Sequence, residues 1–176
     1  MTGISIRSAS LGDVRTIAEF HVSAWRHTYR GIAPAHAYAV IDAPYRCRMW
    51  EQKLSANDGS LIVLLAEIAG RTVGMGAACA PSQPEYGGRG EIRSLYVDAD
   101  FKRRGIGRAL LARLATHLES LHYRGAALSV VKENAPAIAF YAALNGRPIG
   151  EYVDPGAVWQ SHNIVFAWDD LTSLMT

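Results

Sequence analysis

The feature that constrains this chain most is an amphipathic helix placed between two apolar strands. Apolar residues recur at helical spacing after Gly105 and predict a helix ending near Gly125, with one side formed by Ile106, Leu110, Leu114, Leu118 and Leu121. Segments 91–97 and 126–131, on either side of it, have the apolar character of strands. Strands joined by a helical crossover pair in parallel. The sequence therefore predicts one parallel strand pair.

The other predicted elements are shorter and favour antiparallel neighbours. They are, in chain order, a strand at 4–7, a helix at 14–29 that Ser10 and Asp13 begin as a capping box, two helices between 34 and 54, a hairpin at 61–77, a helix at 134–145, and strands at 147–153 and 163–168. Imperfect alternation in 91–97 predicts a β-bulge. We expect an α/β fold of the α+β type, with a mixed, mostly antiparallel sheet flanked by helices.

Composition excludes several classes of protein. A chain of 176 residues that is 49% hydrophobic can bury a core as a single domain over 1–176, and it is not disordered. The formal net charge of +2 is too small for general nucleic-acid binding. Cys47 and Cys79 lack disulfide or zinc spacing, and the six histidines form no HExxH motif, so no metal site is expected.

The same features predict a compartment. Two unpaired cysteines favour a reducing, cytoplasmic location. The N-terminal residues lack the basic and apolar segments of an export signal, and no apolar run approaches the ~20 residues that a membrane helix needs. We therefore expect neither export nor a membrane span.

The turn before the long helix has the chemistry of an anion site. A helix N-terminus offers unpaired N–H groups and partial positive charge, and glycines allow a phosphate to approach the backbone. Here these features occur with four cationic side chains in the run Lys102, Arg103, Arg104, Gly105, Ile106, Gly107 and Arg108. A pyrophosphate is the ligand that this pattern favours.

Two common phosphate motifs do not fit this run. A dinucleotide fingerprint needs a third glycine where Leu110 stands, and a P-loop needs Gly-Lys-Ser/Thr. The remaining pattern, a strand followed by basic-x-x-Gly-x-Gly and a helix, resembles the GNAT superfamily of acetyl-CoA-dependent N-acetyltransferases. Segments 95–98, 102–111 and 134–146 carry the resemblance, which covers most of the chain. Lys102 departs from the usual Gln or Arg of the family pattern.

The resemblance implies a fold and a set of binding residues for acetyl-CoA. The fold is a sheet of about seven strands with a V-shaped opening beside 95–97. The backbone of Leu95, Tyr96 and Val97 would bind the acyl and pantetheine groups as an added strand would. Residues 102–108 would hold the pyrophosphate, and Asn134 would contact the pantetheine arm. The implied reaction is direct acetyl transfer to a primary amine in a ternary complex.

Acyl transfer to an amine needs a base and an acid. An alkylammonium with a pKa of ~10 must lose a proton, and a thiolate whose conjugate acid has a pKa of ~8.5 leaves more easily if protonated. Tyr141 lies about two helical turns after Asn134, on the same face, and matches the family's thiol-protonating tyrosine. Glu91 stands where several family members hold a catalytic glutamate. A strand-end carboxylate paired with Arg93 is the plainer interpretation of Glu91.

The acceptor is an amine that one sequence does not identify. Trp25 and Tyr29 lie in segments that form the acceptor side in the family, although each could simply be packing. A non-catalytic acyl-CoA-binding regulator with the same fold is the alternative function. No nucleic-acid partner is expected, because no aromatic residues are interleaved with the basic cluster. The strands at 149–168 could pair across a homodimer.

Overall fold

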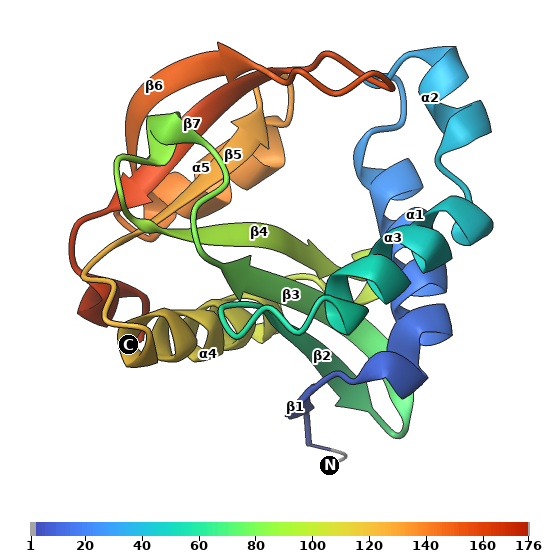
Figure 1. Cartoon of the computed structure of the whole chain (residues 1–176), viewed down its shortest axis with the longest axis horizontal. Helices are drawn as coiled ribbons and strands as arrows, with labels where there is room; N and C mark the ends of the chain where they lie inside the picture. The colour runs from blue at the N-terminus through green and yellow to red at the C-terminus, as the bar shows by residue number, and fades with distance from the viewer. Residues whose placement is uncertain (1–2, 176) are drawn as a thin grey trace.

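A single mixed sheet organises the chain. The computed structural model describes residues 3–175, and in them seven strands lie in the order β1-β2-β3-β4-β5-β7-β6 (Figure 1). The strands are β1 (Ser5–Ser8), β2 (Ile62–Ile68), β3 (Arg71–Cys79), β4 (Gly90–Val97), β5 (Ala126–Val131), β6 (Arg147–Val153) and β7 (His162–Trp168). β4 and β5 are parallel, and every other neighbouring pair is antiparallel. This arrangement confirms the predicted fold class.

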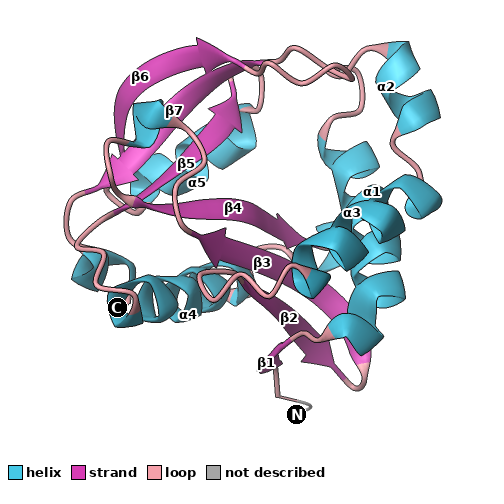
Figure 2. Ribbon diagram, viewed as in Figure 1, coloured by secondary structure: helices cyan, strands magenta, loops and turns pink. Residues whose placement is uncertain are grey.

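Helices cover both faces of the sheet (Figure 2). They are α1 (Val14–Thr28), α2 (Ala35–Val40), α3 (Ala43–Ser55), α4 (Ile106–Ser120) and α5 (Ala135–Ala143), with 3₁₀ turns η1 (Leu11–Asp13), η2 (Pro84–Tyr86), η3 (Ala99–Phe101) and η4 (Leu171–Leu174). Leu110, Leu114 and Tyr141 belong to the apolar cluster on the α4 and α5 side. Ile17 and Trp50 pack with alternate residues of β2 and β3 on the α1 and α3 side. None of the described helices is both long enough and apolar enough to cross a bilayer.

Local signals set most of the helix boundaries. The Ser10 N–H donates to Asp13 Oδ2 at 2.8 Å, as expected for the capping box, and the chain enters α1 through η1. Two short helices occupy the 34–54 region as predicted, with Asp42 accepting from the Tyr45 N–H at the start of α3. The prediction for α4 was wrong at its end. It stops at Ser120 because His122 adopts a left-handed φ of 67°.

The sheet divides between β4 and β5. Their pairing consists of Gly90 with Ala126 and Glu91 with Ala127, after which the described strands separate. On its other edge β4 carries the predicted bulge, because Ala77 pairs with Ser94 while Ala78 pairs with Ile92. The backbone of β4 beyond Glu91 therefore lacks a strand partner on the β5 side.

Candidate active site

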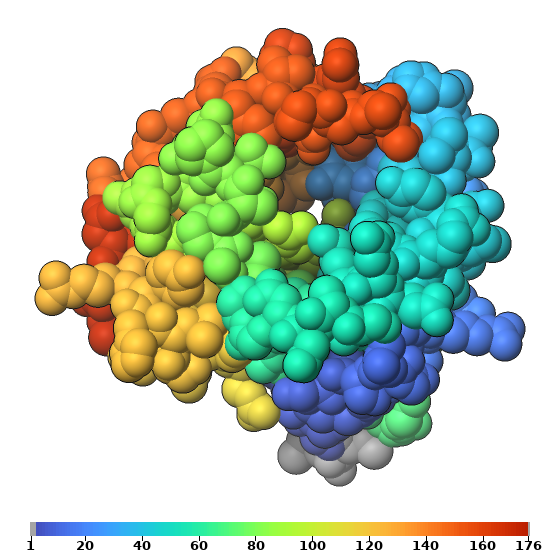
Figure 3. All heavy atoms as spheres, in the orientation of Figure 1, coloured from blue at the N-terminus to red at the C-terminus, as the bar shows by residue number. Residues whose placement is uncertain are grey.

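The divergence of β4 and β5 opens a cavity in the middle of the molecule. Its volume is about 410 Å³, and it is lined by parts of α1, α3, β4 and β5 and by the loop between β6 and β7. Figure 3 shows this hollow framed by the 80–93 region, the α1–α3 region and the β6–β7 loop. A second depression, about 540 Å³, lies where residues 119–124 meet 169–172, and it contains none of the predicted site residues. The central cavity is the candidate active site, because the predicted site residues Trp25, Tyr29 and Glu91 line it.

Glu91 lies at the point where the two strands separate. Its side chain is almost fully buried, and its Oε2 accepts the Ser82 N–H at 2.8 Å. The Arg93 Nε lies 3.3 Å from Glu91 Oε1, so the two charges compensate each other. Both residues line the cavity. Glu91 therefore forms the ion pair with Arg93 that the plainer interpretation expects, and it also lines the cavity.

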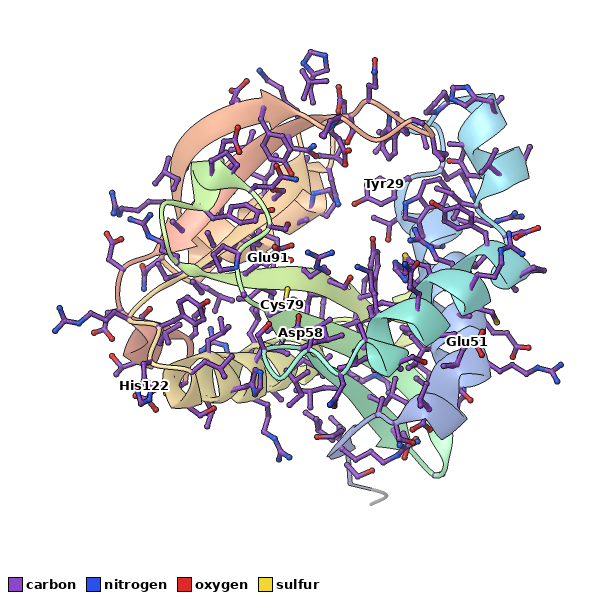
Figure 4. The ribbon with its side chains drawn as sticks, in the orientation of Figure 1. Tyr29, Glu51, Asp58, Cys79, Glu91 and His122 are labelled. Atoms are coloured by element: carbon purple, nitrogen blue, oxygen red, sulfur yellow. The ribbon has the colours of Figure 1, made fainter. Side chains whose placement is uncertain are left out.

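Three tyrosines and Asn134 form a second group near the opening. Tyr29, at the end of α1, points into the central space (Figure 4). Burial raises the pKa of Tyr29, and hydrogen bonds of its side chain with Tyr96 and Asn134 act in the opposite direction. The Asn134 Oδ1 also accepts the Ala137 N–H at 3.3 Å as the N-cap of α5. Asn134 therefore caps α5 and also lies near the opening.

Tyr141 lies on α5 and belongs to the same group. It is 8% exposed and packs edge-on against Phe140 and Trp168. Burial raises the pKa of Tyr141, and the nearby Tyr29 adds to that effect. Within the described residues its hydroxyl has no hydrogen-bond partner. Tyr141 and Asn134 do not line the cavity themselves, but Tyr29 does, and it connects the two groups.

The predicted anion turn is exposed and has the expected backbone. Gly105 is the N-cap of α4 with a left-handed φ of 80°, and Arg103 is also left-handed with φ 61°. Nothing lies within 4 Å of where a Cβ on Gly105 would stand, so the space in front of the helix is open. Lys102, Arg103, Gly105 and Arg108 are exposed, as is Arg104, which stacks on Phe101 at 4.9 Å. Cationic side chains thus surround a free helix N-terminus.

An aromatic group closes one side of the cavity. Trp25 and Tyr29, both predicted on the acceptor side, line it, and the Trp159 ring lies 5.2 Å from that of Tyr29. The His36 Nε2 lies 2.7 Å from the Val158 carbonyl oxygen. Through these contacts the β6–β7 loop meets α2 and the end of α1 (Figure 1).

Several cavity residues other than Tyr86, an aromatic that the resemblance places on the acceptor side, were not identified from the sequence. Arg46 and Tyr45 come from α3, and Tyr86, Ser129 and Tyr152 join through hydroxyl contacts of 2.7 and 2.8 Å. Nothing local separates Arg46 from the other basic residues of its helix. Only the packing of α3 beside the opening distinguishes it.

Cys79 lies beside this site. It pairs with Glu91 across β3 and β4, and Figure 4 shows the two side chains near each other. The thiol is 5% exposed, and burial raises its pKa, with Glu91 adding to the effect. A thiol held protonated in this way is a poor nucleophile. Neither cysteine lines the cavity.

Comparisons with known proteins agree with this geometry. Residues 22–146 match the family model described as Acetyltransferase (GNAT) family. The chain is 28% identical over 174 residues to the uncharacterized N-acetyltransferase YuaI of Bacillus subtilis, covering 98% of this chain and 97% of that protein.

Two examples illustrate the solved structures that share the fold. One is the PaiA N-acetyltransferase of Thermoplasma acidophilum in complex with coenzyme A, with a TM-score of 0.72, 20% identity, and coverage of 94% of this chain and 98% of that chain. The other is the yncA acetyltransferase of Salmonella typhimurium with acetyl-CoA, with a TM-score of 0.68, 20% identity, and coverage of 96% and 94%.

Proposed function

The chain belongs to the GNAT family of acetyltransferases, and from this membership we propose that it transfers an acetyl group from acetyl-CoA to a primary amine bound in the central cavity. The observation that carries the proposal is the separation of β4 from β5 after Glu91. That separation leaves an unpaired strand edge between an anion-binding turn on one side and an acceptor cavity on the other. Transfer is direct, because neither cysteine lines the cavity and the Cys79 thiol is buried.

The chain has groups that suit each part of acetyl-CoA, which supplies an activated thioester. The free edge of β4 at Leu95, Tyr96 and Val97 can pair with the amides of the pantetheine arm as a further strand would. Asn134 lies beside the opening and would contact the same arm. These residues hold and orient the thioester at the mouth of the cavity.

The α4 turn suits a pyrophosphate. N–H groups of the first helical turn have no intrahelical partner, and the Gly105 conformation directs them outward. The charges that would neutralise the phosphates are those of Lys102, Arg103, Arg104 and Arg108, while Ile106 and Gly107 contribute backbone N–H groups.

Two side chains are proposed to move protons. Tyr141 has a raised pKa because of its burial, so it stays protonated and can donate its hydroxyl proton to the departing thiolate. Glu91 faces the cavity and is proposed to accept the proton of the acceptor ammonium, directly or through water. The Ser82 N–H and Arg93 hold its carboxylate in place.

Release of free thiol from acetyl-CoA tests the proposal. The purified chain is assayed against pools of amino acids, polyamines, aminoglycosides and short peptides. We expect thiol release that depends on one pool, with the acetylated amine identified by mass spectrometry. Binding of acetyl-CoA with no amine-dependent release in any pool would instead support the non-catalytic acyl-CoA-binding regulator.

Three further statements belong to the proposal. The whole chain, 1–176, acts as one acetyltransferase domain, since one sheet includes strands from Ser5 to Trp168. It works in the cytoplasm, a reducing compartment that suits the free Cys47 and Cys79. It forms a homodimer along β6, one of the two edge strands of the sheet, where Ile149 and Val153 are exposed.

A further inference from the structure

Arg46 brings a positive charge to the cavity without a negative partner. It extends from α3 and lines the cavity, and its buried Nε has no hydrogen-bond partner within residues 3–175. Its terminal Nη1 contacts only the weak acceptor Met49 Sδ, at 3.4 Å, and its guanidinium lies 5.8 Å from the centre of the Tyr45 ring. Among the described residues no carboxylate forms a salt bridge with it.

None of the other charged groups that line the cavity forms a salt bridge with Arg46 among the described residues. Arg93 is compensated by Glu91 at 3.3 Å. Asp154, on the opposite side, accepts the Gly156 N–H at 2.7 Å through its Oδ1. His21, which does not line the cavity, brings no negative charge to Arg46, because burial lowers its pKa and the ring is neutral, with its Nδ1 accepting from Trp50. Arg46 is thus the cavity cation whose charge the described protein leaves uncompensated.

A half-buried cation without a partner has a cost in the free protein. Burial lowers the pKa of Arg46, although the guanidinium of arginine stays charged at any physiological pH. An uncompensated charge in such a place is stabilised when a ligand of opposite charge arrives. The planar guanidinium matches a carboxylate, to which it can donate two parallel hydrogen bonds.

We infer that the acceptor is an amine that also carries a carboxylate, an amino acid or a close analogue, and that Arg46 is the residue that binds this carboxylate. The inference rests on the proposed function and names the acceptor class. The rings of Trp25, Tyr29 and Trp159 offer apolar surface for the rest of the acceptor. A polyamine fits poorly, because it would bring additional cations to a cavity with an uncompensated arginine.

The test compares acceptors that differ only in the acidic group. Each of the twenty amino acids is assayed beside its carboxamide, and phenethylamine and aminomethylphosphonate are added as acid-free and phosphonate probes. Binding of the same compounds to the chain in the presence of CoA is measured by calorimetry, so that recognition is read without turnover. We expect at least one amino acid to exceed its carboxamide by about 100-fold in kcat/KM, as for a desolvated charge pair.

Variants of Arg46 assign that preference to its side chain. In Arg46→Met the preference for carboxylate over carboxamide, measured as the ratio of the two kcat/KM values, should fall to a few-fold. Arg46→Lys should keep part of it, since the charge remains but the paired donors are lost. Arg48→Met, an exposed position on the same helix, is the matched control and should keep it in full.

The outcomes separate the inference from the proposed function. Acetylation of amines without preference for a carboxylate would overturn the inference alone, as would a carboxylate preference that survives Arg46→Met. Failure of every amino acid to bind the CoA complex would overturn it as well. A preference for aminomethylphosphonate over glycine would replace the carboxylate with a phosphonate. A thermal midpoint of Arg46→Met that is equal to or higher than wild type shows that the variant is folded, and that the charge serves binding.

Discussion

Tyr141 combines a buried ring with a hydroxyl that no described group engages, and this combination sets its expected kinetic role. The ring packs against Phe140 and Trp168, so Tyr141→Phe keeps the packing and removes only the proton donor. We predict that kcat falls about 100-fold, within the usual contribution of general acid catalysis, while the KM for acetyl-CoA changes little. Steady-state kinetics with the best acceptor measures both quantities.

A second tyrosine provides the control. Tyr123 is partly buried against the same core but lines the other depression, where residues 119–124 meet 169–172, so Tyr123→Phe should retain wild-type kcat. If Tyr141→Phe also retained wild-type kcat, the thiolate would leave without a proton from Tyr141, and the acid role would be withdrawn.

His21 makes stability depend on pH. Its Nδ1 accepts the Trp50 Nε1–H at 3.0 Å, which requires that nitrogen to be unprotonated, and burial lowers the pKa of His21 in the folded state. The unfolded chain takes up the proton near pH 6.5, so this stabilisation is complete above that pH and is lost as the pH falls below it. The slope from one such group reaches about 1.4 kcal/mol per pH unit.

We therefore predict that His21→Gln weakens the pH dependence of the free energy of unfolding between pH 7 and 5. Urea denaturation at several pH values gives the slope, which is compared between variants rather than the absolute stability. His27→Gln, an exposed position on the same helix, should keep the wild-type slope. Equal slopes for His21→Gln and wild type would show that His21 takes up its proton at the same pH in the folded and unfolded chain, contrary to its burial.

Individual site residues differ in how far their sequence neighbourhood reveals them. Local spacing predicts Gly105, Asn134 and Tyr141, because a turn, a helix cap and a helix face each depend only on residues nearby in the sequence. Arg46 is not predicted in this way, since its importance comes from a cavity formed by five separate parts of the chain. The nearness of Cys79 to Glu91 depends on strand register, which a bulge shifts by one residue.

At the scale of elements, the start of α4 links conformation to binding. Gly105 has φ 80° and no atom near its missing Cβ, so Gly105→Ala is penalised only through the backbone, by about 1 kcal/mol. We predict that this variant also raises the KM for acetyl-CoA several-fold, because relaxation of the turn redirects its N–H groups. Thermal unfolding and acetyl-CoA titration measure the two effects.

Gly88 offers a matched control in the loop before β4. It has φ 78°, again with nothing within 4 Å of its missing Cβ, and β4 separates it from the α4 turn. Gly88→Ala should lose similar stability and leave the KM for acetyl-CoA unchanged. Equal KM changes in both variants would mean that the effect comes from stability and not from the anion site.

The order of elements could be predicted because each one carries its own periodicity, but some boundaries could not. The left-handed Asn145 precedes glycine, a recognisable stop signal, and α5 ends there as expected. The left-handed His122 carries no comparable signal, so the predicted α4 extended past its true end. The separation of β4 from β5 comes from tertiary packing and was foreseen only through the family resemblance.

At the scale of the molecule, the cavity exists because the sheet is almost divided in two between β4 and β5. Two ladder pairs join β4 to β5, and one further hydrogen bond, from the Gly90 N–H to the Gly125 carbonyl at 3.0 Å, extends the junction. A Cβ on Gly90 would lie 2.6 Å from the Leu118 side chain, so glycine lets α4 pack directly beneath the junction. The α4 and α5 core then holds both halves together while the opposite ends of the strands stay apart.

The free edge of the second half determines the expected assembly. β6 ends the sheet, with Ile149 37% and Val153 48% exposed, while Pro148 and the adjacent bulge restrict ladder pairing at its start. We predict that two copies pair along the later residues of β6 and that light scattering during size-exclusion chromatography gives twice the chain mass of 19.1 kDa. Val153→Lys should shift the mass to the monomer, because like charges would meet across a two-fold axis.

The control is Arg15→Lys, at an exposed position of α1, which should leave the dimer intact. A monomeric mass for the wild type at high protein concentration would show that Pro148 and the bulge protect the edge from pairing. The cavity, to which β6 of the same copy contributes Tyr152, would then be complete without a second copy.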